Sequence, residues 1–174
     1  MTTAIACDHL RIALAHVGQI SERRMSHLWD AFFEQEAGAG VPPPGWEPPE
    51  LFGLSLRYPA AATFSELKQL AAPATLDAPP LDIGIEDHAT SAPLTARKTG
   101  EALDLLEEIL SIEVLMASDV LGGEQPAPML GERTSTVIER ARQTIGALEE
   151  DRSPAHVQRS VAAALFAPSV DTSE

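Results

Sequence analysis

Three neighbouring residues, Glu86, Asp87 and His88, are the groups in this sequence best suited to chemistry. Two carboxylates and an imidazole can exchange protons or bind a polar substrate when a loop between rigid elements presents them together. The surrounding stretch is rich in proline and separates two predicted helices, which places the three residues on such a loop. The residue types alone favour a structural role instead, in which Asp87 caps a turn and His88 bonds to the backbone.

The rest of the sequence offers no second catalytic motif. A glycine-rich phosphate loop and the HExxH and GxSxG motifs are all absent from it. His9 and His16 are seven residues apart with no carboxylate between them, so no metal site is expected. Cys7 is the single cysteine, which excludes a disulfide or a CxxC site within the chain, and we expect a small buried side chain. The acidic runs at 107–108 and 149–151 are typical of solvated faces.

Length and charge narrow the class of protein. The chain has 174 residues, of which 44% are hydrophobic, so it can form one folded domain with a core. Its net charge of -14 argues against binding to nucleic acids or to anionic membranes, because such partners select basic surfaces. Asp8, His9 and Arg11 interrupt any apolar run at the N-terminus, so no signal peptide is predicted. We expect a cytoplasmic protein without a membrane span.

The spacing of apolar residues favours an all-α fold, because sustained alternation with a period of two is absent. We interpret residues 1–174 as one domain, with irregular loops over 37–58 and 73–93 and a tail over 167–174. Five helices are expected within it. They run from about Ala4 to about Glu36, Pro59 to Ala71, Leu94 to Leu121, Thr134 to Glu150, and Pro154 to Phe166.

Two of these helices carry apolar rows that predict how they pack. The first helix has one apolar face, formed by Leu10, Ala13, Leu14, Val17 and Ile20. Gly18 within it is expected to permit close packing or to mark a bend. The longest helix has two rows, which predict contacts on two sides, as inside a helical bundle. The rows are Leu103, Leu106, Leu110, Val114, Ala117 and Leu121, and Leu105, Ile109, Ile112, Met116 and Val120. Because this is more apolar surface than so short a chain needs, part of it is expected to lie against another chain.

Five segments, in order along nearly the whole chain, carry a resemblance to a known family. They are Gly18 to Arg24, which contains Ser-Glu-Arg-Arg; Ala60 to Lys68, with Ser65 and Glu66; Pro73 to Asp77; Glu86 to Thr99, with Glu-Asp-His and Arg-Lys-Thr; and Glu150 to Val157. Together they resemble the C-terminal part of the aromatic amino acid ammonia-lyases, which comprise the histidine, phenylalanine and tyrosine ammonia-lyases and the related aminomutases. The resemblance implies a C-terminal lyase-like domain in the family's bundle of long antiparallel helices.

The resemblance also implies a split enzyme. In the family the substrate amine attacks an electrophilic methylidene-imidazolone group, made from an internal Ala-Ser-Gly triplet, and ammonia is eliminated; aminomutases add it back. No Ala-Ser-Gly occurs in the 174 residues, and the single tyrosine, Tyr58, matches none of the family's catalytic tyrosines. We therefore expect no cofactor in this chain and no activity alone. The expected partner is an N-terminal lyase half that carries Ala-Ser-Gly, in a hetero-oligomer with a tetrameric core that acts on an amino acid. Met1, which falls within a family helix region, is interpreted as the native start of a separate subunit.

Roles for particular residues follow from the same resemblance. Glu86 falls on the family position that faces the substrate, which is Glu in histidine ammonia-lyases and usually Gln in the phenylalanine and tyrosine enzymes. The resemblance therefore implies that Glu86 is catalytic and that it binds substrate together with Ile85. Supporting positions around them are implied for Ser65, Glu66, Lys68, Asp87 and His88.

Departures from the family pattern support a rival interpretation. Ile85 stands where the family commonly has Gln or Asn, and Gly84 replaces a usual Asn. Both changes favour a non-catalytic lyase-like interaction or regulatory subunit, and a truncated remnant without function is a third interpretation. For the segment Ser21 to Arg24 a structural role is predicted, in which ion pairs hold neighbouring helices.

Overall fold

The computed structural model describes residues 2–38, 40–41, 50–76, 83, 91–123 and 128–167. All regular structure within these residues is helical, which confirms the all-α prediction. The elements are α1 (Thr2–Gly38), the 3-10 helix η1 (Leu54–Leu56), α2 (Arg57–Leu70), α3 (Ala92–Gly123), α4 (Glu132–Gly146) and α5 (Pro154–Phe166).

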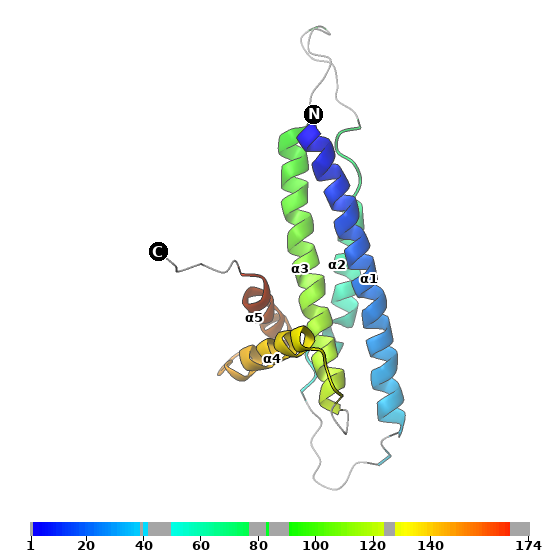
Figure 1. The fold of residues 1–174 in the computed structure, drawn as a ribbon, viewed down its shortest axis with the longest axis vertical. Helices are drawn as coiled ribbons and strands as arrows, with labels where there is room; N and C mark the ends of the chain where they lie inside the picture. Colours follow the sequence, from blue (N-terminus) through cyan, green and yellow to red (C-terminus); the bar gives the residue numbers. More distant parts are fainter. Residues whose placement is uncertain are drawn as a thin grey trace.

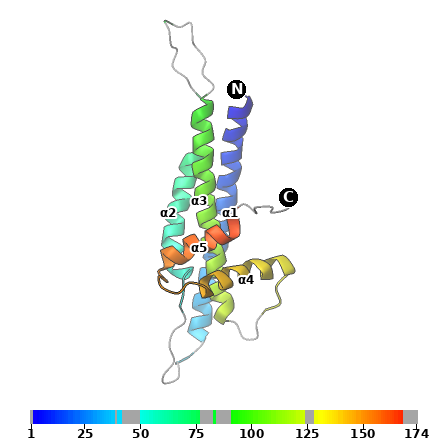
Figure 2. The same ribbon diagram turned by 90° about the vertical axis from the view of Figure 1, so that its left-hand side faces the viewer.

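Helices α1, α2 and α3 form an elongated bundle (Figure 1). Helices α1 and α3 both begin at its upper end and run downward together, whereas α2 runs upward against them. Helices α4 and α5 pack on each other and cross the lower half of α3 (Figure 2). The upper end of the bundle therefore gathers the start of α1, the end of α2 and the start of α3.

The face of α1 that packs into the bundle repeats every three or four residues, as a helix requires. Its buried residues are Ala4, Asp8, Arg11, Leu14, Gly18, Ser21 and Met25. The predicted apolar face is therefore wrong, because Leu10, Val17 and Ile20 are exposed and only one member of that row is buried. Polar and charged residues make up much of the inward row, and they hide it in the sequence because such residues ordinarily lie at the surface.

Helix α3 packs on two sides, as its two apolar rows predict. One side places Ile109, Ile112 and Met116 in the core shared with α1 and α2. The other side places Leu115, which belongs to neither predicted row, in a smaller core with α4 and α5, and Val114 of the first row packs against that core. Of the two rows only Leu103 is exposed. The chain therefore covers most of this apolar surface itself, and α3 supplies little of the surface that was expected to face another chain.

Two glycines allow elements to approach closely. A Cβ atom on Gly18 would lie 2.7 Å from Cδ2 of Leu67, so this glycine lets α1 and α2 pack tightly, as predicted. A Cβ atom on Gly53 would lie 2.0 Å from the backbone nitrogen of Met116. The residue just before η1 thus rests directly on the backbone of α3, where only glycine fits.

Most predicted helix boundaries agree with the structure to within two residues, but α4 ends at Gly146, about one turn earlier than predicted. The side chain of Arg152 folds back there, and its Nη1 donates hydrogen bonds to the carbonyl oxygens of Ile145 at 3.1 Å and Leu148 at 3.5 Å. These bonds reinforce the turn at the end of α4, where the Ile145 carbonyl also accepts a hydrogen bond from the backbone N–H of Leu148 at 3.2 Å. Helix α5 then begins at Pro154, as predicted.

Candidate functional site

The predicted site residues Ile85, Glu86, Asp87 and His88 lie outside the described residues. The structure does describe how the chain is held on either side of them. The end of α2 and the start of α3, which flank this segment, both lie at the upper end of the bundle beside the start of α1 (Figure 1). A buried polar network connects the three helix ends.

Arg11 of α1 is the centre of this network. Its fully buried guanidinium group donates hydrogen bonds to main-chain carbonyls on both flanks of the predicted site. Toward α2, Nε donates to the carbonyl oxygen of Leu70 at 2.7 Å and Nη2 to that of Ala72 at 3.3 Å. Toward α3, Nη1 donates to the carbonyl oxygen of Thr95 at 3.1 Å and to Oγ1 of Thr99 at 3.4 Å. One side chain therefore ties both flanks to α1.

Asp8 extends the network along the chain that leaves α2. It lies about one turn before Arg11 on α1 and accepts a hydrogen bond from Nη2 of that residue. Its Oδ2 accepts hydrogen bonds from the backbone N–H groups of Ala74 and Thr75, both at 3.1 Å, and from the Thr75 hydroxyl at 2.7 Å. The chain that leads from α2 toward Glu86 is thus fixed on a carboxylate.

Hydrogen bonds also set the charge of this network. Burial by itself raises the pKa of the Asp8 carboxyl, but hydrogen bonds from Thr75, Ala74 and Arg11 favour the ionised form and lower this pKa to about 2. At neutral pH Asp8 is therefore a carboxylate paired with a guanidinium. Among the described residues, no buried side-chain nitrogen or oxygen lacks a hydrogen-bond partner. Asp8 acts as a structural anion rather than as a proton carrier.

The start of α3 contributes further bonds from the segment Arg97 to Thr99. Nζ of Lys98 donates to the carbonyl oxygen of Ala72 at 2.9 Å, so a second cation reaches the same carbonyl as Arg11. Oγ1 of Thr99 donates to the carbonyl oxygen of Thr95 at 2.7 Å, one helical turn back. These contacts leave the two flanks of the predicted site joined to each other as well as to α1.

The three supporting residues predicted on α2 are all exposed, and the structure does not bring them together. Oγ of Ser65 donates to the carbonyl oxygen of Ala61 at 3.0 Å, within the same helix. Glu66 lines an open groove of about 450 Å³ between α2 and α3. Nζ of Lys68 lies 5.1 Å from the centre of the Phe64 ring. Their position beside a substrate stays a prediction.

The segment Ser21 to Arg24 holds helices together, as predicted. Glu113 of α3 accepts hydrogen bonds from Oγ of Ser21 at 2.6 Å and from Nη2 of Arg24 at 2.9 Å, both on Oε2. The hydrogen bond with Glu113 raises the pKa of the Arg24 guanidinium. Glu22 accepts a hydrogen bond from Nη2 of Arg57 at 2.5 Å. The segment therefore ties α1 to both α2 and α3.

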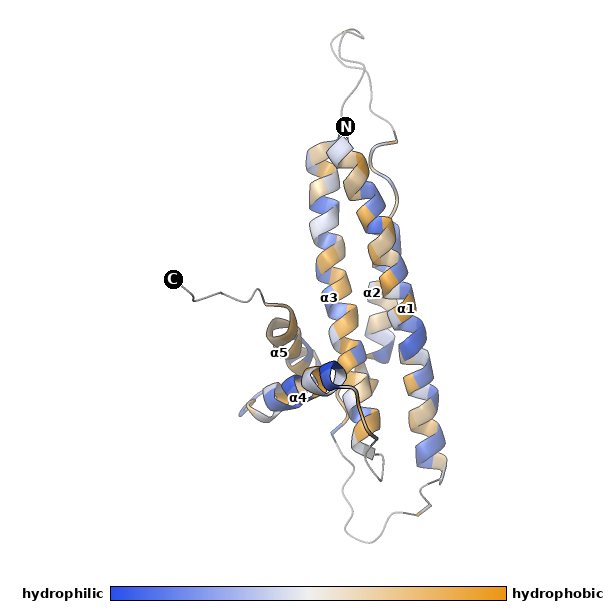
Figure 3. Cartoon of the chain, in the orientation of Figure 1, coloured by the Kyte–Doolittle hydropathy of each residue, from blue (hydrophilic) through white to orange (hydrophobic). Residues whose placement is uncertain are grey.

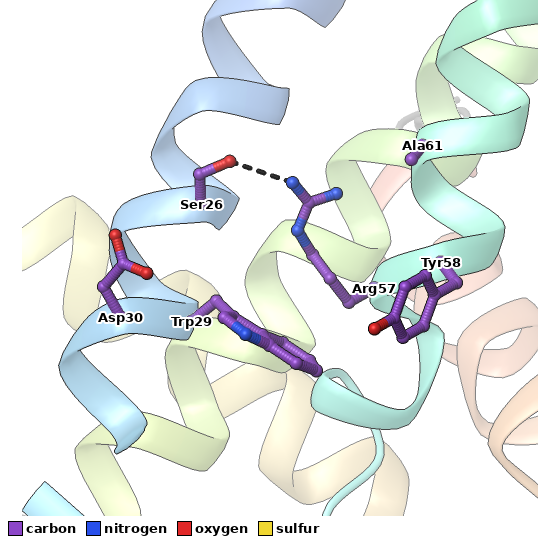
Figure 4. A pocket seen from close by; sticks show the side chains of 6 residues that line it. All are labelled: Ser26, Trp29, Asp30, Arg57, Tyr58 and Ala61. Atoms are coloured by element: carbon purple, nitrogen blue, oxygen red, sulfur yellow. Dashed lines mark hydrogen bonds between the residues drawn. The ribbon is translucent and has the colours of Figure 1, made fainter. Parts of the chain in front are cut away.

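A surface pocket of about 300 Å³ lies between α1 and the start of α2, beside Arg57 (Figure 4). Nη2 of Arg57 donates to Oγ of Ser26 at 2.8 Å, and the rings of Trp29 and Tyr58 meet edge to face with centroids 6.0 Å apart. The pocket begins fifteen residues beyond Arg11 on α1, a distance of about 22 Å along a helix. It is therefore separate from the network that flanks the predicted site.

Two kinds of feature are absent from the described part of the chain. No group of three or more His, Cys, Asp and Glu side chains there could hold a metal ion. No helix among the described residues combines the length and the apolar composition that crossing a membrane requires.

Known proteins match this chain closely enough to assign it. The sequence model of the family described as aromatic amino acid lyase matches residues 1–143. The chain belongs to the aromatic amino acid lyase family. It is 32% identical to the histidine ammonia-lyase of Natranaerobius thermophilus, over 86% of this chain and 29% of that protein. It is 34% identical to the histidine ammonia-lyase of Caldanaerobacter subterraneus subsp. tengcongensis, over 86% of this chain and 28% of that protein.

Solved structures of the lyase family have the same fold. The crystal structure of histidine ammonia-lyase from Trypanosoma cruzi superposes with a TM-score of 0.70 at 27% identity, over 91% of this chain and 30% of that one. Phenylalanine aminomutase from Pantoea agglomerans gives a TM-score of 0.65 at 23% identity, over 92% of this chain and 31% of that one. The chain thus spans about 30% of the length of the lyases that it matches.

Proposed function

We propose that this chain is the C-terminal part of a two-chain aromatic amino acid ammonia-lyase or 2,3-aminomutase. In this proposal residues 1–174 form one lyase-like helical domain, and a partner chain completes the active site. The observation that carries the proposal is the extent of the family match, which covers most of this chain but only about 30% of each relative. A region that is missing here must then be supplied from elsewhere for the family's chemistry to occur.

The electrophile belongs to the missing region. The family's methylidene-imidazolone group forms from Ala-Ser-Gly, and this chain has no such triplet, so its own residues cannot form the group. The partner of the proposed complex is therefore a lyase chain with Ala-Ser-Gly, and the assembly has the tetrameric core that the family resemblance implies.

The contribution of this chain to the proposed site is Glu86, with Ile85 beside it. Glu86 would contact the polar side chain or the amino group of the substrate, and Asp87 and His88 would support it. The network of Asp8 and Arg11 supports this assignment, because it ties both flanks of the segment that carries Glu86 to the start of α1. Burying two charges costs desolvation free energy, which favours a functional role for the segment whose flanks the network holds.

The experiment that tests the proposal is reconstitution. The chain is purified alone and after co-expression with the product of an adjacent reading frame that encodes Ala-Ser-Gly. Turnover of histidine, phenylalanine and tyrosine is followed by absorbance of the unsaturated acid, and aminomutation by chromatography of the amino acids. We expect no turnover by the chain alone and turnover by the pair.

Each other outcome contradicts part of the proposal. Turnover by the isolated chain excludes the need for a partner. An assembled pair that turns over none of these amino acids, or whose activity equals that of the partner alone, supports the non-catalytic regulatory subunit instead.

A further inference from the structure

The outer face of α1 carries large apolar side chains that this chain does not cover. Five residues define this face: Ile5, Leu10, Ile12, Val17 and Ile20, each between 37% and 54% exposed. Hydrophobic residues are visible on the upper half of α1 in Figure 3, where no other helix lies in front of the ribbon. Helices α4 and α5 pack on α3 and leave the outer face of α1 open.

The distribution of polarity on α1 differs from that on an ordinary surface helix, because its buried face mixes charged residues with apolar ones. A surface helix buries its apolar residues and turns its polar residues to water. The buried face of α1 instead contains Asp8, Arg11 and Ser21, while its β-branched and leucine side chains are mostly exposed. Large apolar side chains exposed over one broad side of a helix in this way mark an interaction surface.

Charge indicates the chemistry of a molecule that would bind there. The whole chain has 26 acidic and 12 basic residues, yet its first 28 residues contain only two carboxylates, Asp8 and Glu22. Both are bound by arginines within the chain, one inside the buried network and one at the start of α2. The exposed polar residues among the apolar ones include His9, His16 and Arg23. The outer face of α1 is thus an acid-free strip on an acidic molecule.

We propose that the outer face of α1 docks a helix of the partner chain that carries the remainder of the lyase fold. The docking helix presents apolar residues flanked by carboxylates, which complement the cationic and imidazole groups of the strip. This inference rests on the proposed function for the existence of that partner. The lengths of the relatives support it, because about 70% of each matched lyase has no counterpart in this chain and could supply the docking helix.

A second copy of this chain fits the strip less well. Two copies would bring together molecules that each carry a net charge of -14, and the strip would meet an identical strip with Arg23 and no carboxylate to pair with it. Like charges that face each other suppress association rather than stabilise it. Self-association through α1 is therefore the outcome that the test must separate from docking of the partner.

The test uses a defined probe. The chain is co-expressed with the histidine ammonia-lyase of Caldanaerobacter subterraneus subsp. tengcongensis from which the segment aligned with this chain has been deleted, and the dissociation constant of the purified pair is measured by sedimentation. We expect Val17→Glu and Ile20→Glu to weaken the complex about 100-fold, because each places a charge in an apolar contact. Arg23→Glu is expected to weaken it about 10-fold at low salt and less at high salt.

The matched control is Met129→Glu, a fully exposed apolar residue before α4, which is expected to change binding by less than about 2-fold. All four variants replace exposed residues, so circular dichroism should give unchanged helix content. A complex that forms equally with every variant, or no complex with the probe, overturns the docking surface. If the α1 variants lose a homodimer but bind the truncated lyase unchanged, the proposed docking surface is wrong and the face serves self-association instead. A complex that assembles through α1 but turns over no amino acid contradicts the proposed activity and leaves the docking surface in place.

Discussion

Arg11 and Asp8 occupy positions where a bundle helix ordinarily carries leucine or valine. A buried ion pair rarely adds net stability over apolar packing, because taking two charges out of water costs about as much as their attraction returns. Its value lies in geometry, since a guanidinium with five N–H donors can fix several carbonyl groups at once. Arg11 uses this capacity on Leu70 and Ala72 at one flank of the predicted site and on Thr95 at the other.

Removing Arg11 should be far more damaging than its charge alone suggests. Arg11→Met is expected to lower the free energy of unfolding by about 3–5 kcal/mol, because it leaves the Asp8 carboxylate buried without its cation and the Leu70 carbonyl without its side-chain donor. The measurement is urea denaturation followed by circular dichroism. Arg97→Met is the matched control, since Arg97 forms an exposed pair with Glu101 and its loss should cost less than about 1 kcal/mol. Equal effects of the two substitutions would show that the network does not hold the bundle end.

Glu86 is the residue on which the proposed chemistry depends. In the reconstituted complex Glu86→Gln is expected to lower kcat/KM by about 10- to 150-fold, because a charge-assisted contact contributes about 1.5–3 kcal/mol. Preference should shift from imidazole toward apolar aromatic side chains, as in the family's Glu and Gln enzymes. Steady-state kinetics over histidine, phenylalanine and tyrosine measure both effects, with sedimentation as the check on assembly. Unchanged kinetics in an intact complex would return Glu86 to a structural role.

At the scale of elements, the close approach of η1 to α3 depends on Gly53. Gly53→Ala is expected to destabilise the chain by about 3 kcal/mol or more, because the added Cβ would lie 2.0 Å from a backbone nitrogen of α3 and neither backbone can yield. Gly100→Ala is the control, as a Cβ there meets nothing within 4 Å and alanine favours a helix by about 1 kcal/mol. Thermal unfolding should show opposite shifts, and similar losses from both would contradict the close contact.

The sequence predicts these elements well because helix periodicity, prolines and glycines are local signals. The orientation of α1 is not local. Leu10, Val17 and Ile20 form the most obvious apolar row, and counting rows assigns it to the core. The structure exposes this row because the true inward face is marked by Asp8 and Arg11, whose burial depends on hydrogen-bond partners more than fifty residues away. Tertiary partners of this kind leave no trace in the pattern of a single helix.

In the candidate site, too, local features could be predicted from the sequence and tertiary contacts could not. The position of Glu86 follows from a family motif, which the residues themselves carry. The role of Thr75 does not, although Thr75 belongs to a segment with family resemblance, because its bonds to Asp8 join residues 67 positions apart. The one usable signal is the spacing of Asp8 and Arg11 in step with Leu14 and Gly18, which places two charges in a row of small and apolar residues.

For the whole molecule, acidity tests how the charged network contributes to folding. The pKa of Asp8 is lowered from 3.8 to about 2 in the folded chain, so the unfolded chain binds the proton first as pH falls. The stability that Asp8 contributes is therefore fully present above about pH 4 and is lost as pH falls toward 2. The pH dependence of the stability that Asp119 contributes has the opposite sign. Burial raises its pKa, although the backbone N–H groups of Leu54, Phe52 and Gly53 oppose the rise, so the folded chain binds that proton first.

Two substitutions should therefore change acid sensitivity in opposite directions. The quantity to compare is the difference in the free energy of unfolding between pH 7 and pH 3, obtained by urea denaturation at each pH. Asp8→Asn should make this difference smaller than in the unmodified chain, because the variant lacks the carboxylate whose stabilising contribution disappears in acid. The variant's stability at pH 7 should nevertheless be lower than that of the unmodified chain. Asp119→Asn should make the difference larger, because the variant lacks the carboxyl group whose protonation in acid favours the folded chain. If both variants showed the same difference as the unmodified chain, carboxylates elsewhere would govern unfolding in acid. Protonation of Asp8 at the upper end of the bundle would then not be what destabilises the fold.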